Sequence, residues 1–170
     1  GSKAEGDGGG LYTAAATEAS RVVIRNNTST TNGGGVYNEG NTSFSRSTIS
    51  GNTAEGGGGL FATGSNTVNI SGVTFSGNRA VGGGAISGRA GVTLKITNST
   101  ISGNIGEDVG AGLYTNGNAQ LNFVTIARNL AGADSPTAGS GLNAFPASST
   151  ANSITLKNVL FDGNKRGWEE

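Results

Sequence analysis

Apolar and polar residues alternate over short runs along this chain, which is the pattern of half-buried β-strands. The clearest run is NTVNISGVTFSGN, residues 66–78. Its apolar side consists of Val68, Ile70, Val73 and Phe75. No segment shows a convincing helical period. We therefore expect an all-β protein built from strands of roughly two to five residues.

The same alternation returns further along the chain. Equivalent apolar positions are held by Leu94, Ile96, Ser99 and Ile101 in the next repeat, and by Ile154, Leu156, Val159 and Phe161 in the last. A third short strand follows each glycine run, and we place it at Leu11-Tyr12, Val36-Tyr37, Leu60-Phe61, Ala85-Ile86 and Leu113-Tyr114. Each repeat then holds about three strands, joined by Gly, Asn and Ser turns.

Two separate motifs keep nearly the same period. The last glycines of the runs are Gly10, Gly35, Gly59, Gly84, Gly112 and Gly141, spaced by 25, 24, 25, 28 and 29 residues. The second motif is an aromatic or β-branched residue, two further residues and Asn. Its apolar members are Ile24, Ile49, Phe75, Ile101, Ile126 and Phe161, and its asparagines are Asn27, Asn52, Asn78, Asn104, Asn129 and Asn164. A shared period in two motifs indicates a repeat architecture.

Three short strands per period, stacked on their equivalents one period later, form a right-handed parallel β-helix of about six coils of roughly 25 residues. A compact β-barrel would need longer strands and gives no reason for a fixed period. In the β-helix, glycine supplies positive φ at the turns, and stacked asparagines bond to backbone groups. We therefore assign structural roles to Gly35, Gly59, Gly84, Gly112, Ile49, Phe75, Ile101, Ile126, Asn52, Asn78, Asn104 and Asn129.

The amino-acid composition limits the catalytic and binding chemistry that the side chains can supply. The 170 residues include 32 glycines but only 2 prolines, and the formal net charge is zero. The chain has no cysteine and no histidine, which removes thiolate sites and the commonest general base and metal ligand. Zero net charge gives no electrostatic footprint for nucleic acid. We predict no cofactor, no metal and no nucleic-acid partner.

A resemblance to a known family rests on the motif residues. GGAI at 83–86, alternating with FSGN at 75–78, resembles the repeats of chlamydial polymorphic outer membrane proteins and of related β-helix proteins of bacterial cell surfaces. The likeness covers residues 7–164, although the first repeat lacks the Gly before Asn27 and the last has a longer insert at 142–154. It implies a secreted or surface-anchored adhesin passenger or spacer. Its partner would be a host-surface protein or glycan, with a membrane reached only through flanking domains.

Enzymes that act on polysaccharides also use parallel β-helices, and in them clustered acids carry the reaction. Glu55 and Glu107-Asp108 precede two glycine runs at the same corner, two coils or roughly 10 Å apart. A carboxylate pair or a calcium ion would fit that corner, but solvated loop charges explain it as well. Because there is no catalytic signature, we predict a protein that is not an enzyme.

A face of threonines offers a different function. The positions on either side of the second-motif apolar residue point outward and read Thr48/Ser50, Thr74/Ser76, Thr100/Ser102 and Thr125/Ala127. This lattice resembles the faces of β-solenoid ice-binding proteins. Thr also favours strands and stacks well on itself. Val23 and Arg25 break the face at one end, and Leu160 and Asp162 break it at the other.

An aromatic line follows the glycine runs, formed by Tyr12, Tyr37, Phe61 and Tyr114. We expect these rings to be partly exposed, where they would stack on sugar rings, while the preceding aliphatic residues lie inside. We divide the chain into a cleavage scar or linker at 1–6, the β-helix at 7–164 and a tail or cap at 165–170. We expect a truncated first coil and a C-terminal mouth covered by Trp168.

Overall fold

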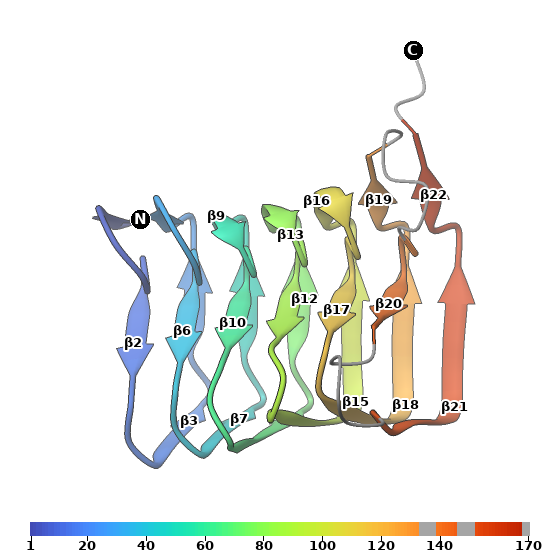
Figure 1. Cartoon of the computed structure of the whole chain (residues 1–170), viewed down its shortest axis with the longest axis horizontal. Helices are drawn as coiled ribbons and strands as arrows, with labels where there is room; N and C mark the ends of the chain where they lie inside the picture. The colour runs from blue at the N-terminus through green and yellow to red at the C-terminus, as the bar shows by residue number, and fades with distance from the viewer. Residues whose placement is uncertain (133–138, 146–151, 168–170) are drawn as a thin grey trace.

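A computed structural model describes residues 1–132, 139–145 and 152–167. Within those residues the chain winds into a solenoid with three parallel sheets and no helix (Figure 1). One sheet, here called sheet A, runs along the top of the view in Figure 1, sheet B lies in front and sheet C behind. Within the described part of the chain, sheet B has six strands, so its first and last strands are five turns apart.

The strands of each sheet come from successive coils. Sheet A contains β1 (Lys3–Ala4), β5 (Thr28–Ser29), β9 (Thr53–Gly56), β13 (Arg79–Gly82), β16 (Ile105–Val109), β19 (Leu130–Ala131) and β22 (Lys165–Arg166). Sheet B contains β2 (Leu11–Thr13), β6 (Val36–Asn38), β10 (Leu60–Ala62), β14 (Ile86–Gly88), β17 (Leu113–Thr115) and β20 (Leu142–Ala144).

Sheet C is the widest of the sheets. It contains β3 (Thr17–Ser20), β4 (Val23–Arg25), β7 (Thr42–Ser45), β8 (Thr48–Ser50), β11 (Thr67–Ser71), β12 (Thr74–Ser76), β15 (Thr93–Ser102), β18 (Asn118–Ala127) and β21 (Ile154–Asp162). In the early coils two short strands cross this sheet, and from β15 on one long strand does so. The expected three strands per coil therefore describe the later coils, whereas the early coils have four.

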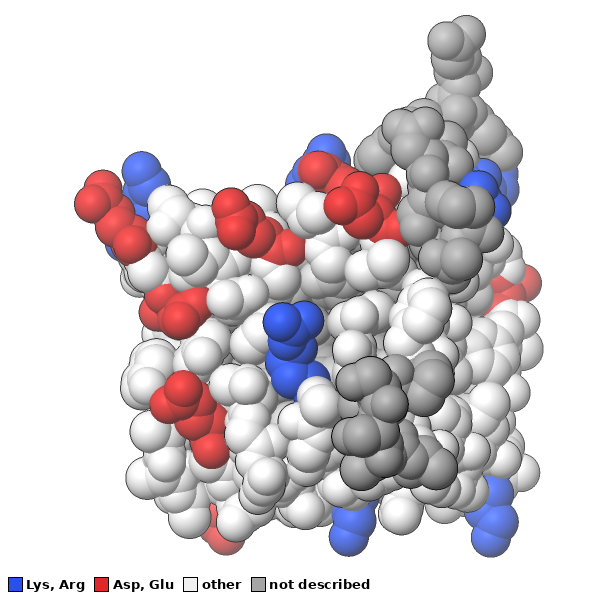
Figure 2. Space-filling model, in the orientation of Figure 1, with Lys and Arg blue, Asp and Glu red and all other residues white. Residues whose placement is uncertain are grey.

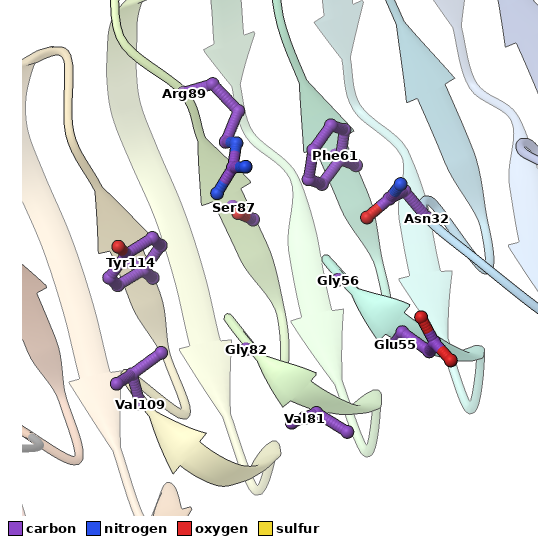
Figure 3. Close-up of a pocket in the computed structure, with 10 residues that line it drawn as sticks. All are labelled: Asn32, Glu55, Gly56, Phe61, Val81, Gly82, Ser87, Arg89, Val109 and Tyr114. Carbon is purple, nitrogen blue, oxygen red and sulfur yellow. The ribbon is translucent and has the colours of Figure 1, made fainter.

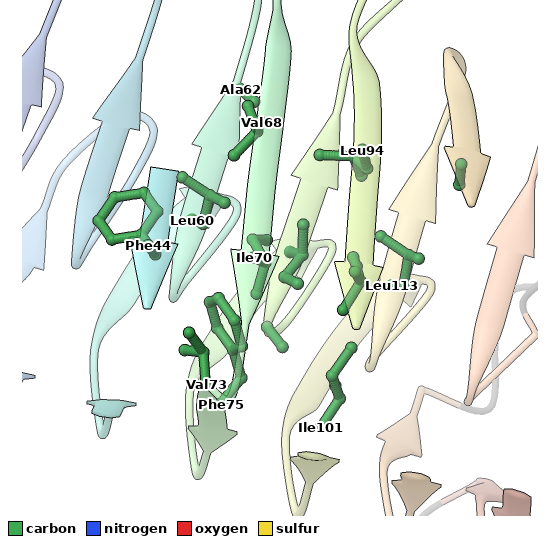
Figure 4. Close-up of a cluster of buried hydrophobic side chains, with 14 of the residues drawn as sticks. Phe44, Leu60, Ala62, Val68, Ile70, Val73, Phe75, Leu94, Ile101 and Leu113 are labelled. Atoms are coloured by element: carbon green, nitrogen blue, oxygen red, sulfur yellow. The ribbon is translucent and has the colours of Figure 1, made fainter. Parts of the chain in front are cut away.

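The side chains that alternate inward stack in columns and form the core (Figure 4). On the interior strands of sheet B the aliphatic residue is fully buried, as at Leu60 and Leu113, whereas Leu11 and Leu142 on the first and last strands are partly buried. The second-motif residues Ile49, Phe75 and Ile101 are also fully buried, as the alternation predicts. Ile126 continues that column in the next coil. Apolar burial of this kind is the main force that holds neighbouring coils together.

The register corrects the glycine alignment. Leu60 pairs with Ile86, so Ala85, and not Gly84, takes the place of Gly59 in the next coil. The run at 56–59 has four glycines while the run at 82–84 has three. Their last members are therefore not equivalent, and the strand is Ile86–Gly88 rather than Ala85-Ile86.

Two of the glycines show why the run is needed. Gly57 has φ of 58°, and a Cβ there would lie 2.4 Å from the backbone oxygen of Leu60. A Cβ on the next residue, Gly58, would lie 2.4 Å from the backbone oxygen of Arg79 in the following coil. Glycine therefore suits this corner, which combines a left-handed turn with close stacking of coils, although two coils later Ala111 takes the place of Gly58.

Strand pairing reaches beyond residues 7–164 at both ends. Lys3–Ala4 pairs with Thr28–Ser29, and Lys165–Arg166 pairs with Leu130–Ala131. Trp168, the expected cap, lies outside the described residues.

The second-motif asparagines form a continuous hydrogen-bonded column at the corner between sheets C and A, here called the asparagine ladder. Its members are Asn27, Asn52, Asn78, Asn104, Asn129 and Asn164. In each step the Oδ1 of one asparagine accepts both the backbone N–H and the side-chain Nδ2 of its predecessor, at 2.9–3.1 Å. From Asn52 on, each Nδ2 also donates to a backbone oxygen of the preceding coil. The four interior asparagines have no exposed surface, and every polar atom of their side chains is used.

Replacing Asn78 by Ala should destabilise the fold strongly. The change leaves the backbone N–H of Asn52 buried without an acceptor, together with one of the two N–H groups of its Nδ2, while the other still donates to the Ile24 oxygen. Each such group costs about 1–3 kcal/mol, so we expect a loss of at least about 2 kcal/mol in the free energy of unfolding. Urea denaturation measures the loss. Asn69→Ala, on the exposed face of sheet C, is the matched control and should change little. Equal stability of the two variants would contradict the role assigned to the asparagine ladder.

Candidate binding surfaces

The predicted threonine face lies on the outer side of sheet C and is called here the Thr–Ser stripe. Thr48, Thr74, Thr100 and Thr125 are paired in register on successive strands. Ser50, Ser76 and Ser102 form the parallel column two residues on. All seven side chains are partly exposed, and they alternate with the buried second-motif column. Strand geometry makes each cell about 4.8 Å by 7 Å.

The stripe is bounded on both sides. On one edge Thr48 pairs with Val23 and Ser50 with Arg25. On the other edge Thr125 pairs with Leu160, and the serine column ends at Ala127. Three coils therefore carry the complete Thr–Ser pair.

The acids before the glycine runs lie on sheet A, with a basic residue between them. Arg79, on β13, pairs with Glu107 of β16 at 2.8 Å, and both side chains are almost half exposed. Glu55 lies on β9, on the other side of β13. Among the described residues no group of three or more acids, histidines or cysteines is placed to hold a metal ion. Glu107 is thus part of an ion pair, which is a different arrangement from the facing carboxylates that the sequence suggested.

The aromatic line is a stack of rings on the outer side of sheet B, here called the aromatic ladder. The Tyr12 and Tyr37 rings are 5.3 Å apart and inclined by 7°, and the Tyr37 and Phe61 rings are 5.4 Å apart and inclined by 11°. The faces of these rings are therefore turned toward one another along the solenoid. The three tyrosines are exposed or partly exposed, as expected, but the expectation is wrong for Phe61, which is only 6% exposed. Because neighbouring rings cover each other, they leave less ring surface for sugars than a platform would.

One position of the aromatic ladder has no ring. Phe61 pairs with Ser87, and Ser87 pairs with Tyr114 on the next coil. The missing ring leaves a groove of about 430 Å³ that reaches from sheet B to the edge of sheet A. Figure 3 shows the Arg89 side chain reaching over Ser87, between Phe61 and Tyr114, with Glu55 on the far side of the groove.

The groove lies on a face that carries charges of both signs. In Figure 2, acidic groups gather along the upper edge of the face with basic groups beside some of them, and one basic group stands apart near the middle. A second groove, of about 460 Å³, lies on sheet C between Lys95 and Lys157.

At the Tyr12–Tyr37 end of the aromatic ladder, both hydroxyl groups contact the carboxylate of Glu39. The Tyr12 hydroxyl donates to Glu39 Oε2 at 2.7 Å, and the Tyr37 hydroxyl donates to Glu39 Oε1 at 3.4 Å. The hydrogen bond to Glu39 is the first cause that raises the pKa of Tyr12. Burial is the first cause that raises the pKa of Tyr37, and the charges of Asp7 and Glu39 add to it.

Comparison with known families agrees with this architecture. A family model described as a right-handed β-helix region matches residues 4–168. The chain belongs to the right-handed β-helix family. The match supports the expected hand of the coil and covers every described strand except the first residue of β1. No curated protein and no solved structure matches this β-helix significantly. In its described part we find no helix with the length and apolarity to cross a membrane.

Sequence reasoning missed the groove. The alignment of Ala85-Ile86 with Leu60-Phe61 placed Ile86 in the aromatic line and hid Ser87. The asparagine spacing carried the needed signal, since Asn52 and Asn78 are 26 residues apart and so are Phe61 and Ser87. Arg89, two residues after Ser87, belongs to neither repeated motif, so the sequence pattern did not single it out.

Replacing Glu39 by Gln should lower the pKa of Tyr12 and Tyr37, because it removes the negative charge that disfavours their phenolates. The chain has three tyrosines, so a Tyr114→Phe background leaves Tyr12 and Tyr37 as the tyrosines that titrate. The ultraviolet absorbance of the phenolate then gives their titration. We expect midpoints above the usual value of about 10 with Glu39 and lower midpoints with Gln.

Glu18→Gln, on the exposed face of sheet C, is the control and should leave the midpoints unchanged. Since the folded pKa is raised, the tyrosines support the fold fully below about pH 10, and this support is lost as the pH rises through the folded pKa. A Glu39→Gln midpoint equal to that of the parent would contradict the assigned cause.

Proposed function

We propose that this β-helix is a non-enzymatic module of the bacterial cell surface, secreted or surface-anchored, that acts as a rigid spacer or adhesive rod. The resemblance of its GGAI and FSGN motifs to the repeats of chlamydial polymorphic outer membrane proteins supports a surface role. A host-surface protein or a glycan would be its partner.

The observation that carries the proposal is the continuity of the asparagine ladder from the first described coil to the last. Each coil is bonded to the next at the same corner, so the solenoid resists bending between coils. A stiff rod keeps whatever it carries at a set distance from the surface that anchors it. The outer face of sheet C repeats the same small polar groups on three successive coils, which suits several weak contacts rather than one deep site.

The purified chain should bind without turning its partner over. We would incubate it with polygalacturonate and other polysaccharides and measure released sugar ends and unsaturated products. A glycan array and binding to host cells would be measured in parallel. We expect no turnover with any polysaccharide. Product formation that depends on the protein would overturn the non-enzymatic proposal, and Glu55→Gln and Glu107→Gln would then test whether these acids carry the reaction.

The Thr–Ser stripe favours a second candidate function, which is ice binding. Its threonines and serines are paired in register and exposed on a regular lattice. Against this candidate, three coils carry the complete pair and serine lacks the methyl group that accompanies such faces. The patch is thus small for holding ordered water.

We therefore expect the wild-type protein neither to shape ice crystals nor to produce thermal hysteresis. The decisive comparison uses the double variant Thr74→Tyr/Thr100→Tyr, whose side chains point away from the core, with Thr53→Tyr on exposed sheet A as its control. Hysteresis that is present in the wild type and in Thr53→Tyr but absent from the double variant would establish ice binding in place of our expectation.

A further inference from the structure

The aromatic ladder has one position without a ring, bounded on both sides by aromatic residues. The Arg89 side chain lies over it, and Phe61 and Ser87 are only 6% and 3% exposed (Figure 3). Phe61 and Tyr114 lie on the coils before and after Ser87, and both line the groove. Two coils span roughly 10 Å, so a ring midway would lie about 5 Å from each neighbour. The existing rings of the ladder are 5.3 and 5.4 Å apart, within the range that aromatic pairs favour. The slot therefore has the height of one flat ring.

A cation without a carboxylate partner stands at this slot. The guanidinium carbon of Arg89 lies 5.7 Å from the centre of the Phe61 ring, and the side chain is exposed. Arg79 forms an ion pair with Glu107, whereas the contact of Arg89 is with the Phe61 ring and not with a carboxylate. Glu55 lines the same groove but lies on its far side (Figure 3). The donors of Arg89 are thus available to an incoming anion.

The Tyr12–Tyr37 end of the aromatic ladder shows how a charged side chain at this position contacts the neighbouring rings. Asn38, Ala62 and Gly88 are paired in register, so Glu39 and Arg89 hold the equivalent positions two coils apart. At Glu39 an anion accepts hydrogen bonds from the hydroxyls of the neighbouring rings. At Arg89 the charge is reversed, so the complementary ring is one that itself carries an anionic group.

We propose that the slot between Phe61 and Tyr114 binds one flat aromatic ring bearing an anionic group, as in an aromatic carboxylic acid. The ring completes the aromatic ladder above Ser87. Arg89 moves aside from the Phe61 face and donates to the anion at the rim of the groove. This assignment does not depend on the surface role, since a spacer without any other partner would hold the same ligand.

The test uses the full chain and three probes of similar size. They are 4-hydroxybenzoate, the uncharged 4-hydroxybenzamide, and cyclohexanecarboxylate, which has the charge without the flat ring. Calorimetric titration or chemical-shift changes measure each affinity at neutral pH. We expect 4-hydroxybenzoate to bind at least about tenfold more tightly than either comparison probe, a difference of about 1.4 kcal/mol.

Two variants locate the binding. Ser87→Phe places a ring in the slot, so it should abolish binding of 4-hydroxybenzoate and raise the melting temperature. Ser43→Phe, on the outer face of sheet C, is the matched control and should do neither. Arg89→Gln changes an exposed residue, and it should weaken 4-hydroxybenzoate about tenfold while leaving 4-hydroxybenzamide nearly unchanged.

Three results would overturn the proposal. The first is no measurable binding of 4-hydroxybenzoate at millimolar concentration. The second is an affinity for cyclohexanecarboxylate equal to that for 4-hydroxybenzoate. Binding would then depend on the charge of Arg89 alone and not on a flat ring in the slot. The third is binding of 4-hydroxybenzoate that persists in a folded Ser87→Phe variant or is unchanged in Arg89→Gln.

Discussion

The asparagine ladder is the interaction on which the rest of this β-helix depends. Each interior asparagine accepts two hydrogen bonds from the preceding coil and donates to the next asparagine and to a backbone oxygen, with no exposed surface. An amide side chain with all its bonds made in a buried site is stable only in one position, because any shift leaves polar groups unpaired. The asparagine ladder therefore sets the register of every coil against its neighbours, which apolar packing alone would leave less defined.

The outer surfaces follow from that register. Since equivalent residues stack on successive coils, any residue type repeated with the period becomes a continuous column on the surface. The Thr–Ser stripe and the aromatic ladder are both products of this rule. A single departure, such as Ser87 among aromatic residues, becomes a gap with a defined height and defined walls. The gap at Ser87 is where we propose that a ligand binds, and the exposed side chain of Arg89 lies at the same place.

Much of the fold could be predicted from the sequence because the period is carried by two motifs of different chemistry. Burial of Ile49, Phe75 and Ile101 follows from alternation alone. The glycine runs were a less reliable guide, since their lengths vary and Gly84 stands one position before the true equivalent of Gly59. Contacts between long exposed side chains were not predictable either. The Arg79–Glu107 pair and the position of Arg89 over Phe61 depend on side-chain conformations that no periodic pattern encodes.

Amide hydrogen exchange followed by NMR tests the central role of the asparagine ladder most directly. The backbone N–H groups of Asn52, Asn78 and Asn104 donate to side-chain oxygens of the next coil, and not to the backbone pattern of any sheet. If the ladder holds the coils in register, these amides should exchange only when the whole solenoid unfolds, as slowly as the central strands of sheet C. Exchange of these amides as rapid as that of the exposed turns, with sheet C still protected, would contradict the account.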